Sequence, residues 1–216
     1  MHGKSAALAG AVLIFATAAT ASAALAATPA PSGEEFTPDP GAAPGSFAFD
    51  KRDGKFAHLD VDVSCAVNAV RANVRFSRYG TRSTPWVPGV GVLLRHGKEI
   101  LGLFVAAAEY RAPFTAELRR FDSDGKLIEA RRFSATVGAD GSFSFFARWT
   151  GDGELIASVG GETQSLSLGA PVEKLILSGY SGAGEFDPLE IGRYRDNSNA
   201  DDTCKPIARL SGVGFG

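Results

Sequence analysis

The sequence has few residues of the kinds that bind metal ions. It contains two cysteines and three histidines in 216 residues. His2 precedes the part expected to fold, which leaves His58 and His96. Tetrahedral zinc sites use closely spaced pairs of cysteine or histidine ligands, and no such pair is present. We therefore expect no metal site, and nothing in the sequence predicts an organic cofactor.

The chain also lacks an excess of charge of either sign. It has 22 Lys and Arg against 24 Asp and Glu, a net charge of −2. Nucleic-acid-binding domains carry a basic surface, so we expect no nucleic-acid partner. Beyond residues 1–27 no segment is long and apolar enough to span a bilayer, so we expect no membrane span.

The first 27 residues have the organisation of a secretory signal peptide. A short polar start containing Lys4 precedes an apolar run from Ala6 to Phe15, and Ala21-Ser22-Ala23 fits the A-x-A cleavage pattern. The apolar run is shorter than the ~20 residues of a spanning helix. We therefore expect cleavage after about residue 27 and a periplasmic or secreted protein.

Export bears on the only two cysteines, Cys65 and Cys204. An exported chain enters an oxidising compartment, where an isolated pair of thiols usually forms a disulfide. This bond would tie the C-terminal segment to the first long predicted strand. The closed loop is long, so the entropic gain reaches an upper figure of about 4–5 kcal/mol.

Composition divides the exported chain into three parts. Residues 28–45 are rich in Pro, Ala and Gly and are expected to form a flexible leader. Residues 46–195 are expected to form the folded domain. Residues 196–216 are expected to form an irregular tail, pinned by the predicted disulfide.

The folded part has the periodicity of β-strands. Apolar residues alternate with polar ones from Leu59 to Val67 and from Val70 to Phe76, with a phase change that predicts a turn or bulge near Asn68-Ala69. The run from Ile100 to Val105 is apolar on both faces, which predicts a central strand covered on both sides.

Turn residues separate further strands. Asp122-Ser123-Asp124-Gly125 lies between two strand patterns and is a strong hairpin signal. Trp149 shares a face with Phe143 and Phe145, which indicates a core position. About ten strands with short turns and no amphipathic helix predict an all-β fold, an antiparallel two-sheet sandwich or jelly roll.

The stretch from Phe143 to Arg193 resembles the closing half of concanavalin A-like lectin/glucanase domains, including laminin-G-like modules. The residues that carry the resemblance are Trp149-Thr150-Gly151-Asp152-Gly153, Gly160-Gly161, Leu177-Ser178-Gly179 and Phe186-Asp187-Pro188-Leu189-Glu190-Ile191. The resemblance implies a two-sheet sandwich and leaves the activity open, because the shared motifs are turn and core residues.

One motif in this stretch is similar to the catalytic strand of laminarinase-like β-glucanases. Glu185, Asp187 and Glu190 form E-x-D-x-x-E, and the resemblance implies that Glu185 would be the nucleophile and Glu190 the acid/base. A retaining mechanism needs the two carboxyl groups about 5–5.5 Å apart. Pro188 would bend the strand and remove a backbone donor, which favours a turn instead.

Aromatic residues near strand ends are the candidate ligand contacts. Trp86 lies between two prolines in Thr84-Pro85-Trp86-Val87-Pro88, and such a residue either forms a binding surface or covers the core. Tyr79 and Tyr110 are further candidates, because aromatic rings stack on the apolar C–H faces of sugars.

Three functions remain open on this sequence. The first is non-catalytic binding of a polysaccharide or glycan of the cell envelope or surroundings. The second is a structural or adhesive role in the envelope. The third is glycan cleavage by Glu185 and Glu190. A shared fold does not decide between them.

Overall fold

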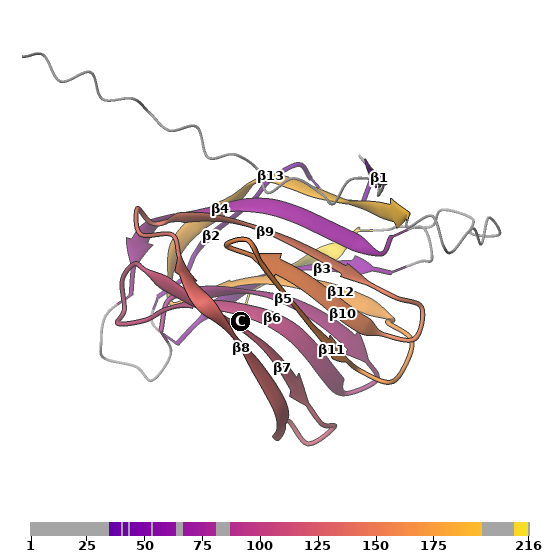
Figure 1. Cartoon of the computed structure of the whole chain (residues 1–216). Coiled ribbons are helices and arrows are strands. Elements are labelled where there is room, and N and C mark those ends of the chain that lie inside the picture. Colours follow the sequence, from indigo (N-terminus) through magenta and orange to yellow (C-terminus); the bar gives the residue numbers. More distant parts are fainter. Residues whose placement is uncertain are drawn as a thin grey trace, which may run out of the picture.

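The computed structural model of the chain describes residues 35–39, 41–42, 44–52, 54–63, 67–80, 87–195 and 210–215. Within these ranges the protein is all-β, without a helix that could cross a membrane. Figure 1 shows two sheets stacked as two layers. Strands pair antiparallel in both sheets, so the predicted antiparallel two-sheet sandwich is confirmed.

Among the described residues, each sheet has seven strands. The first sheet contains β1 (Glu35–Pro38), β2 (Phe47–Asp50), β4 (Ala69–Tyr79), β9 (Ser142–Trp149), β10 (Glu154–Val159), β11 (Glu162–Ser167) and β13 (Gly182–Arg195). The second sheet contains β3 (Phe56–Asp62), β5 (Gly89–His96), β6 (Glu99–Ala107), β7 (Phe114–Phe121), β8 (Leu127–Val137), β12 (Lys174–Tyr180) and β14 (Leu210–Phe215). The strand orders are β1-β13-β4-β9-β10-β11, with β2 also on β13, and β14-β3-β12-β5-β6-β7-β8.

Alternation of side chains places the core between the sheets. In β9 every second residue from Phe143 to Trp149 is buried, and Trp149 is a core residue as predicted. Phe186 of β13 is fully buried, and its ring lies 5.6 Å from that of Phe47 and 6.3 Å from that of Phe145. The inward positions of each strand therefore form one apolar layer, and the outward positions are left for other roles.

Two strands lie in ranges that the sequence predicted to be a flexible leader and an irregular tail. β1 pairs with the end of β13, where Phe36 is opposite Tyr194, and β14 pairs with β3. Both are joined to a sheet edge through backbone hydrogen bonds, which leave little trace in the hydrophobic pattern. The predicted break near Asn68-Ala69 falls where β3 has ended and β4 begins.

Strand β6 corrects one prediction. It is central in the second sheet, and its odd-numbered residues from Leu101 to Ala107 face the core. Its other face, which includes Ile100 and Phe104, is not covered by another layer but lines a surface hollow. The apolar run therefore belongs to a strand with one face in the core and the other face in the surface hollow, and not to a strand buried on both sides.

Candidate functional site

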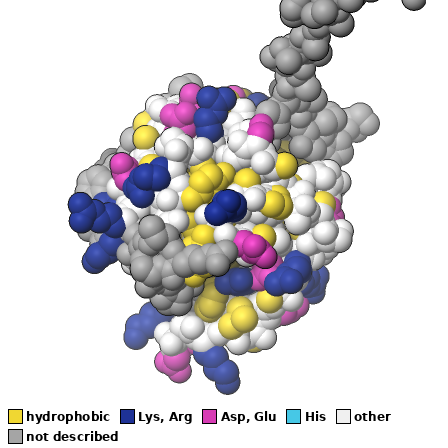
Figure 2. Space-filling view, turned by 90° about the vertical axis from the view of Figure 1, so that its left-hand side faces the viewer, with side chains coloured by type: hydrophobic (Ala, Val, Ile, Leu, Met, Phe, Trp, Pro, Cys, Tyr) yellow, Lys and Arg dark blue, Asp and Glu magenta, His cyan; other side chains and the backbone are white. Residues whose placement is uncertain are grey.

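The outer face of the second sheet carries a hollow of about 710 Å³. Residues of five neighbouring strands, β3, β12, β5, β6 and β7, line it, together with Val87 before β5 and Gly125 in the β7–β8 turn. Its volume lies within the range of small-molecule sites, roughly 300–1,000 Å³. A space-filling view shows apolar side chains gathered on one face of the molecule, with basic and acidic side chains among them (Figure 2).

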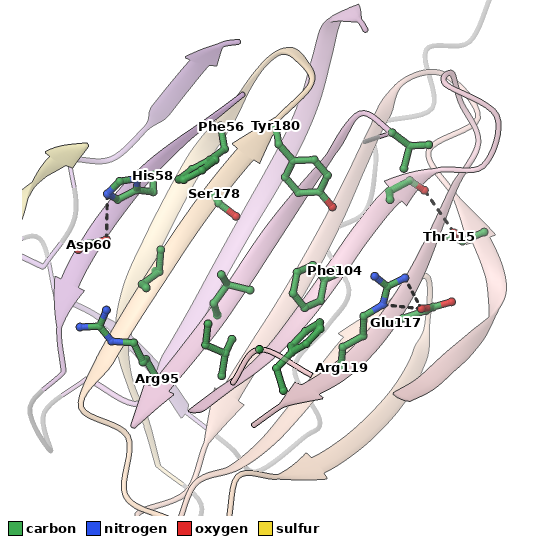
Figure 3. Close-up of a pocket in the computed structure, with 17 residues that line it drawn as sticks. Phe56, His58, Asp60, Arg95, Phe104, Thr115, Glu117, Arg119, Ser178 and Tyr180 are labelled. Atoms are coloured by element: carbon green, nitrogen blue, oxygen red, sulfur yellow. Dashed lines mark hydrogen bonds and ion pairs between the residues drawn. The ribbon is translucent and has the colours of Figure 1, made fainter. Parts of the chain in front are cut away.

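Strand register sets the order of side chains across this hollow. One row across the five strands consists of His58, Ser178, Gly91, Phe104 and Glu117. The next row is Asp60, Ile176, Leu93, Gly102 and Arg119. In both rows the two ends carry hydrogen-bonding or charged groups. The positions between them are small or apolar, so the hollow has an apolar floor (Figure 3). On either side of the floor is a polar bank, formed by His58 and Asp60 on β3 and by Glu117 and Arg119 on β7.

Glycines on the outward side of β5 and β6 give the hollow its depth. A Cβ atom on Gly89 would lie 2.6 Å from the hydroxyl oxygen of Tyr180, and one on Gly102 would lie 2.5 Å from a methyl carbon of Leu93. The side chains of Tyr180 and Leu93 therefore occupy the space above Gly89 and Gly102. A side chain at any of these glycines, including Gly91, would raise the floor.

Glu117 organises the bank on β7. It accepts hydrogen bonds from the Nε atoms of Arg119, at 2.8 Å, and of Arg132, at 2.7 Å. Burial raises the pKa of the Glu117 carboxyl. The hydrogen bonds and charges of Arg119 and Arg132 together lower it by more, so the net pKa is below its ordinary value. Two guanidinium groups thus share one carboxylate, and Figure 3 shows Arg119 and Glu117 on the same side of Phe104.

The bank on β3 has fewer internal hydrogen bonds. His58 Nε2 lies 3.7 Å from Asp60 Oδ1, and Lys174 Nζ of β12 lies 3.4 Å from Asp60 Oδ2. His58 Nδ1 and the Nε of Arg95 are buried and have no hydrogen-bond partner in the described ranges. Buried polar atoms normally have hydrogen-bond partners, so these two nitrogens are exceptions that require an explanation.

Aromatic rings form part of the floor and one end of the hollow. The rings of Phe104 and Phe121 meet edge to face at 5.9 Å, and the guanidinium of Arg119 lies 5.5 Å from the centre of the Phe104 ring. Burial raises the pKa of Tyr180, against a smaller lowering by Arg119. Its phenol therefore stays neutral, with a hydroxyl that can both donate and accept hydrogen bonds.

The residues of the E-x-D-x-x-E motif lie on the other sheet. Glu185 and Glu190 of β13 pair with Arg75 and Arg71 of β4, four residues apart, which separates them by about 13 Å along the strand. Glu190 also accepts a hydrogen bond from Arg71 Nε at 2.7 Å. A register shift between Phe186 and Leu189 contains Asp187 and Pro188. The structure therefore does not bring the two glutamates to the spacing of a retaining pair.

The three aromatic candidates are placed differently. Trp86 lies outside the described residues, although the next residue, Val87, lines the hollow. Tyr79 stacks on Phe76 with ring centres 5.7 Å apart and packs against the core. Tyr110 lies in the connection from β6 to β7 and has a positive φ of 62°. Neither tyrosine lines the hollow, and a role in ligand binding stays a prediction for all three.

Sequence reasoning missed the hollow because it sought binding residues in loops. The signal was present in two strands that occupy the centre of the sheet. Gly89, Gly91 and Leu93 alternate with buried valines in β5, and Ile100, Gly102 and Phe104 alternate with buried residues in β6. Apolar residues and glycines at outward positions of central strands mark a surface that a ligand can cover.

In the described part of the chain, no group of three or more His, Cys, Asp or Glu side chains is arranged to hold a metal ion.

No protein-family model and no curated protein matches the chain. Solved structures with a similar fold include Bacteroides ovatus "Xyloglucan PUL GH43B", with 14% identity and a TM-score of 0.41 over 58% of this chain and 27% of that chain. Others are an apo Crh5 transglycosylase, with 13% identity and a TM-score of 0.49 over 79% and 81% of the two chains, and the carbohydrate binding module CBM66 from Bacillus subtilis, with 9% identity and a TM-score of 0.46 over 74% and 96%.

This chain spans about a quarter of the length of the Bacteroides ovatus protein. The likenesses are distant, and the sheets themselves establish the sandwich. Membership of the concanavalin A-like superfamily stays a prediction. The chain is thus similar in fold to β-sandwich proteins named for glycans or carbohydrate binding.

Proposed function

We propose that the protein binds a glycan in the hollow on the outer face of the second sheet. The observation that carries this proposal is the apolar floor of Phe104, Leu93 and Ile176 between two banks of hydrogen-bonding side chains. Ligand sites typically combine such an apolar surface with a few placed polar groups.

The chemistry of a sugar ring matches this arrangement. A pyranose has apolar C–H faces and an edge of hydroxyl groups. The face of one sugar would lie on the ring of Phe104 with its hydroxyls near Glu117, and a further sugar of an oligosaccharide would extend across the sheet toward His58 (Figure 3). The glycines beneath allow the sugar to approach the sheet closely.

The placement of carboxylates favours binding over cleavage. Asp60 and Glu117 lie on β3 and β7, four strand spacings apart, which corresponds to about 19 Å. Glycosidases need a carboxyl pair at roughly 5–9.5 Å. Glu117 also bonds to two arginines, which hold it as an ionised hydrogen-bond acceptor.

The sequence of residues 1–27 leads us to propose that binding takes place in the periplasm or outside the cell. These residues lie outside the described ranges. A polysaccharide or another glycan of the envelope or surroundings is then the accessible ligand.

Affinity electrophoresis of the purified protein through gels containing neutral and acidic polysaccharides tests the proposal. We expect retardation by at least one glycan and its loss in Phe104→Ala. The matched control is Phe146→Ala, which removes a ring from the outward side of the first sheet. Equal retardation of both variants, or none of the native protein, would refute binding in the hollow.

A further inference from the structure

Within the described residues, not every charged side chain around the hollow has a partner of opposite charge. Asp60 and Glu117, which line the hollow, and Asp62 beside it each have a basic partner. Glu117 is bonded to Arg119 and Arg132, and Asp60 and Asp62 both lie within 4 Å of Lys174 Nζ. Arg119, Arg132 and Lys174 therefore each have a carboxylate partner within the protein.

Arg95 is the exception within the described ranges. It lies on β5 at one end of the hollow, and no carboxylate there pairs with its guanidinium. The acidic residues that flank it in the chain and the fold are engaged elsewhere, Glu99 with Arg120 at 3.4 Å and Glu173 with His96 at 3.3 Å. Its Nε is buried without an acceptor.

The residue opposite Arg95 is also a cation. Lys174 is directly opposite Arg95 in the β12–β5 pair, on the same outward face. Like charges directly opposite one another destabilise a sheet. Asp60 and Asp62 offset the charge of Lys174, whereas Arg95 has no carboxylate partner among the described residues and would gain one from an anionic ligand.

We propose that the bound glycan is acidic and that Arg95 receives its carboxylate or sulfate group. This inference rests on the proposed function and adds a ligand class and a direction to it. The acidic group lies at the end with Arg95 and Lys174, and the sugar rings continue over Gly91 and Phe104 toward Tyr180. A planar guanidinium suits either oxyanion, because it can donate two parallel hydrogen bonds.

Paired ligands that differ only in charge test this inference. Isothermal titration at low ionic strength would compare oligomers of galacturonate, mannuronate and hyaluronate with their methyl esters, and sulfated carrageenan oligomers with desulfated ones. We expect the native protein to bind at least one acidic member about tenfold or more tightly than its neutral form. The carboxylate and sulfate pairs identify which oxyanion is recognised.

Arg95→Gln should abolish the preference while the neutral form still binds, which also shows that the variant is folded. Arg75→Gln, which removes an exposed arginine from the outward side of the first sheet, should leave the preference unchanged. Added salt should reduce it in the native protein only.

Equal affinity for the acidic and neutral members would overturn the acidic-ligand inference and leave glycan binding standing. Binding of no member by the native protein would overturn both.

Discussion

At the scale of single residues, Glu117 joins two strands at the rim of the hollow. Its carboxylate bonds to Arg119 of its own strand and to Arg132 of β8. The side chain is only 13% exposed, whereas the guanidinium of Arg132 is largely in solvent. The sequence placed arginines on both sides of the 122–125 hairpin, but the register that brings Arg132 opposite Glu117 depends on a bulge that no pattern revealed.

Replacing Glu117 by Gln should lower stability in a pH-dependent way. The folded-state pKa of Glu117 is below its ordinary value of 4.5, so its contribution is present above that pH and is lost as pH falls through the folded pKa. Urea unfolding at pH 7 should show a loss of about 1–2 kcal/mol. At about pH 3 the difference should shrink.

The matched control for this change is Glu129→Gln, which removes one partner of an exposed ion pair with Arg131. It should cost under about 1 kcal/mol at both pH values. A cost for Glu117→Gln that grows as the pH falls would contradict the linkage.

At the scale of secondary-structure elements, alternation predicted most strands correctly and the outward faces poorly. The core positions of β3, β4 and β9 follow directly from apolar residues at every second position. In β5 and β6 inward and outward side chains also alternate, but the outward residues are apolar or glycine. The sequence pattern of these strands is therefore that of a strand with both faces in the core. Only the arrangement of the second layer shows which face is open.

A large side chain in the floor of the hollow should weaken glycan binding without unfolding the sheet. In Gly91→Leu the new Cβ would lie 2.8 Å from Ser178 Oγ, and the nearest atoms are side-chain atoms that can move. We expect at least a tenfold loss of glycan affinity, because the leucine occupies the position of a sugar ring.

Gly151→Leu adds the same side chain to the β9–β10 turn, where no atom lies within 4 Å of the new Cβ, and should leave affinity unchanged. Titration of both variants with the same glycan checks this. Native-like affinity in Gly91→Leu would place the ligand elsewhere.

Strand β1 was not predicted because it depends on a few tertiary contacts. The ring of Phe36 meets that of Phe146 edge to face at 6.0 Å, and the guanidinium of Arg71 lies 5.0 Å above it. An aromatic pair and a cation–π contact each contribute about 1 kcal/mol.

Phe36→Ala should therefore release β1 locally while the sandwich stays folded. Hydrogen exchange read by mass spectrometry should show at least tenfold faster exchange for the amides of Glu35–Thr37, with β9 and β13 protected. The neighbouring change Thr37→Ala, at an exposed position, should have little effect. Unaltered protection in Phe36→Ala would mean that the backbone bonds hold β1 without the ring.

At the scale of the whole molecule, the sandwich was predictable because nearly every strand contributes one apolar face. The order of strands in each sheet was not, since pairing between distant strands such as β3 and β12 leaves no local signal. The two predicted processing events, loss of residues 1–27 and the Cys65–Cys204 disulfide, fall outside the described residues and stay predictions.

The pairing of β14 with β3 bears on that disulfide. Leu210 is opposite Val61, and the chain continues from there by four residues to Cys65 and leads back by six residues to Cys204. Both segments leave the paired strands at the same end, and their lengths, at most about 14 and 21 Å, are compatible with the predicted disulfide. We expect protein purified after export to lack about residues 1–27 and two thiol hydrogens by intact mass.

Reduction of that protein should lower its melting temperature, since the bond stabilises by up to about 4–5 kcal/mol. A double Cys65→Ser, Cys204→Ser variant should melt at the reduced temperature with or without reductant. Free thiols in the exported native protein would contradict the predicted bond.

The most direct test of glycan binding in the hollow is the mapping of amide chemical shifts during titration with a glycan that retards the protein. We predict that the shifts concentrate in β3, β12, β5, β6 and β7, at residues that line the hollow, including Ser178, Leu93 and Phe104. Shifts centred on the outward face of β13 and β4, around Glu185 and Glu190, would contradict binding in the hollow.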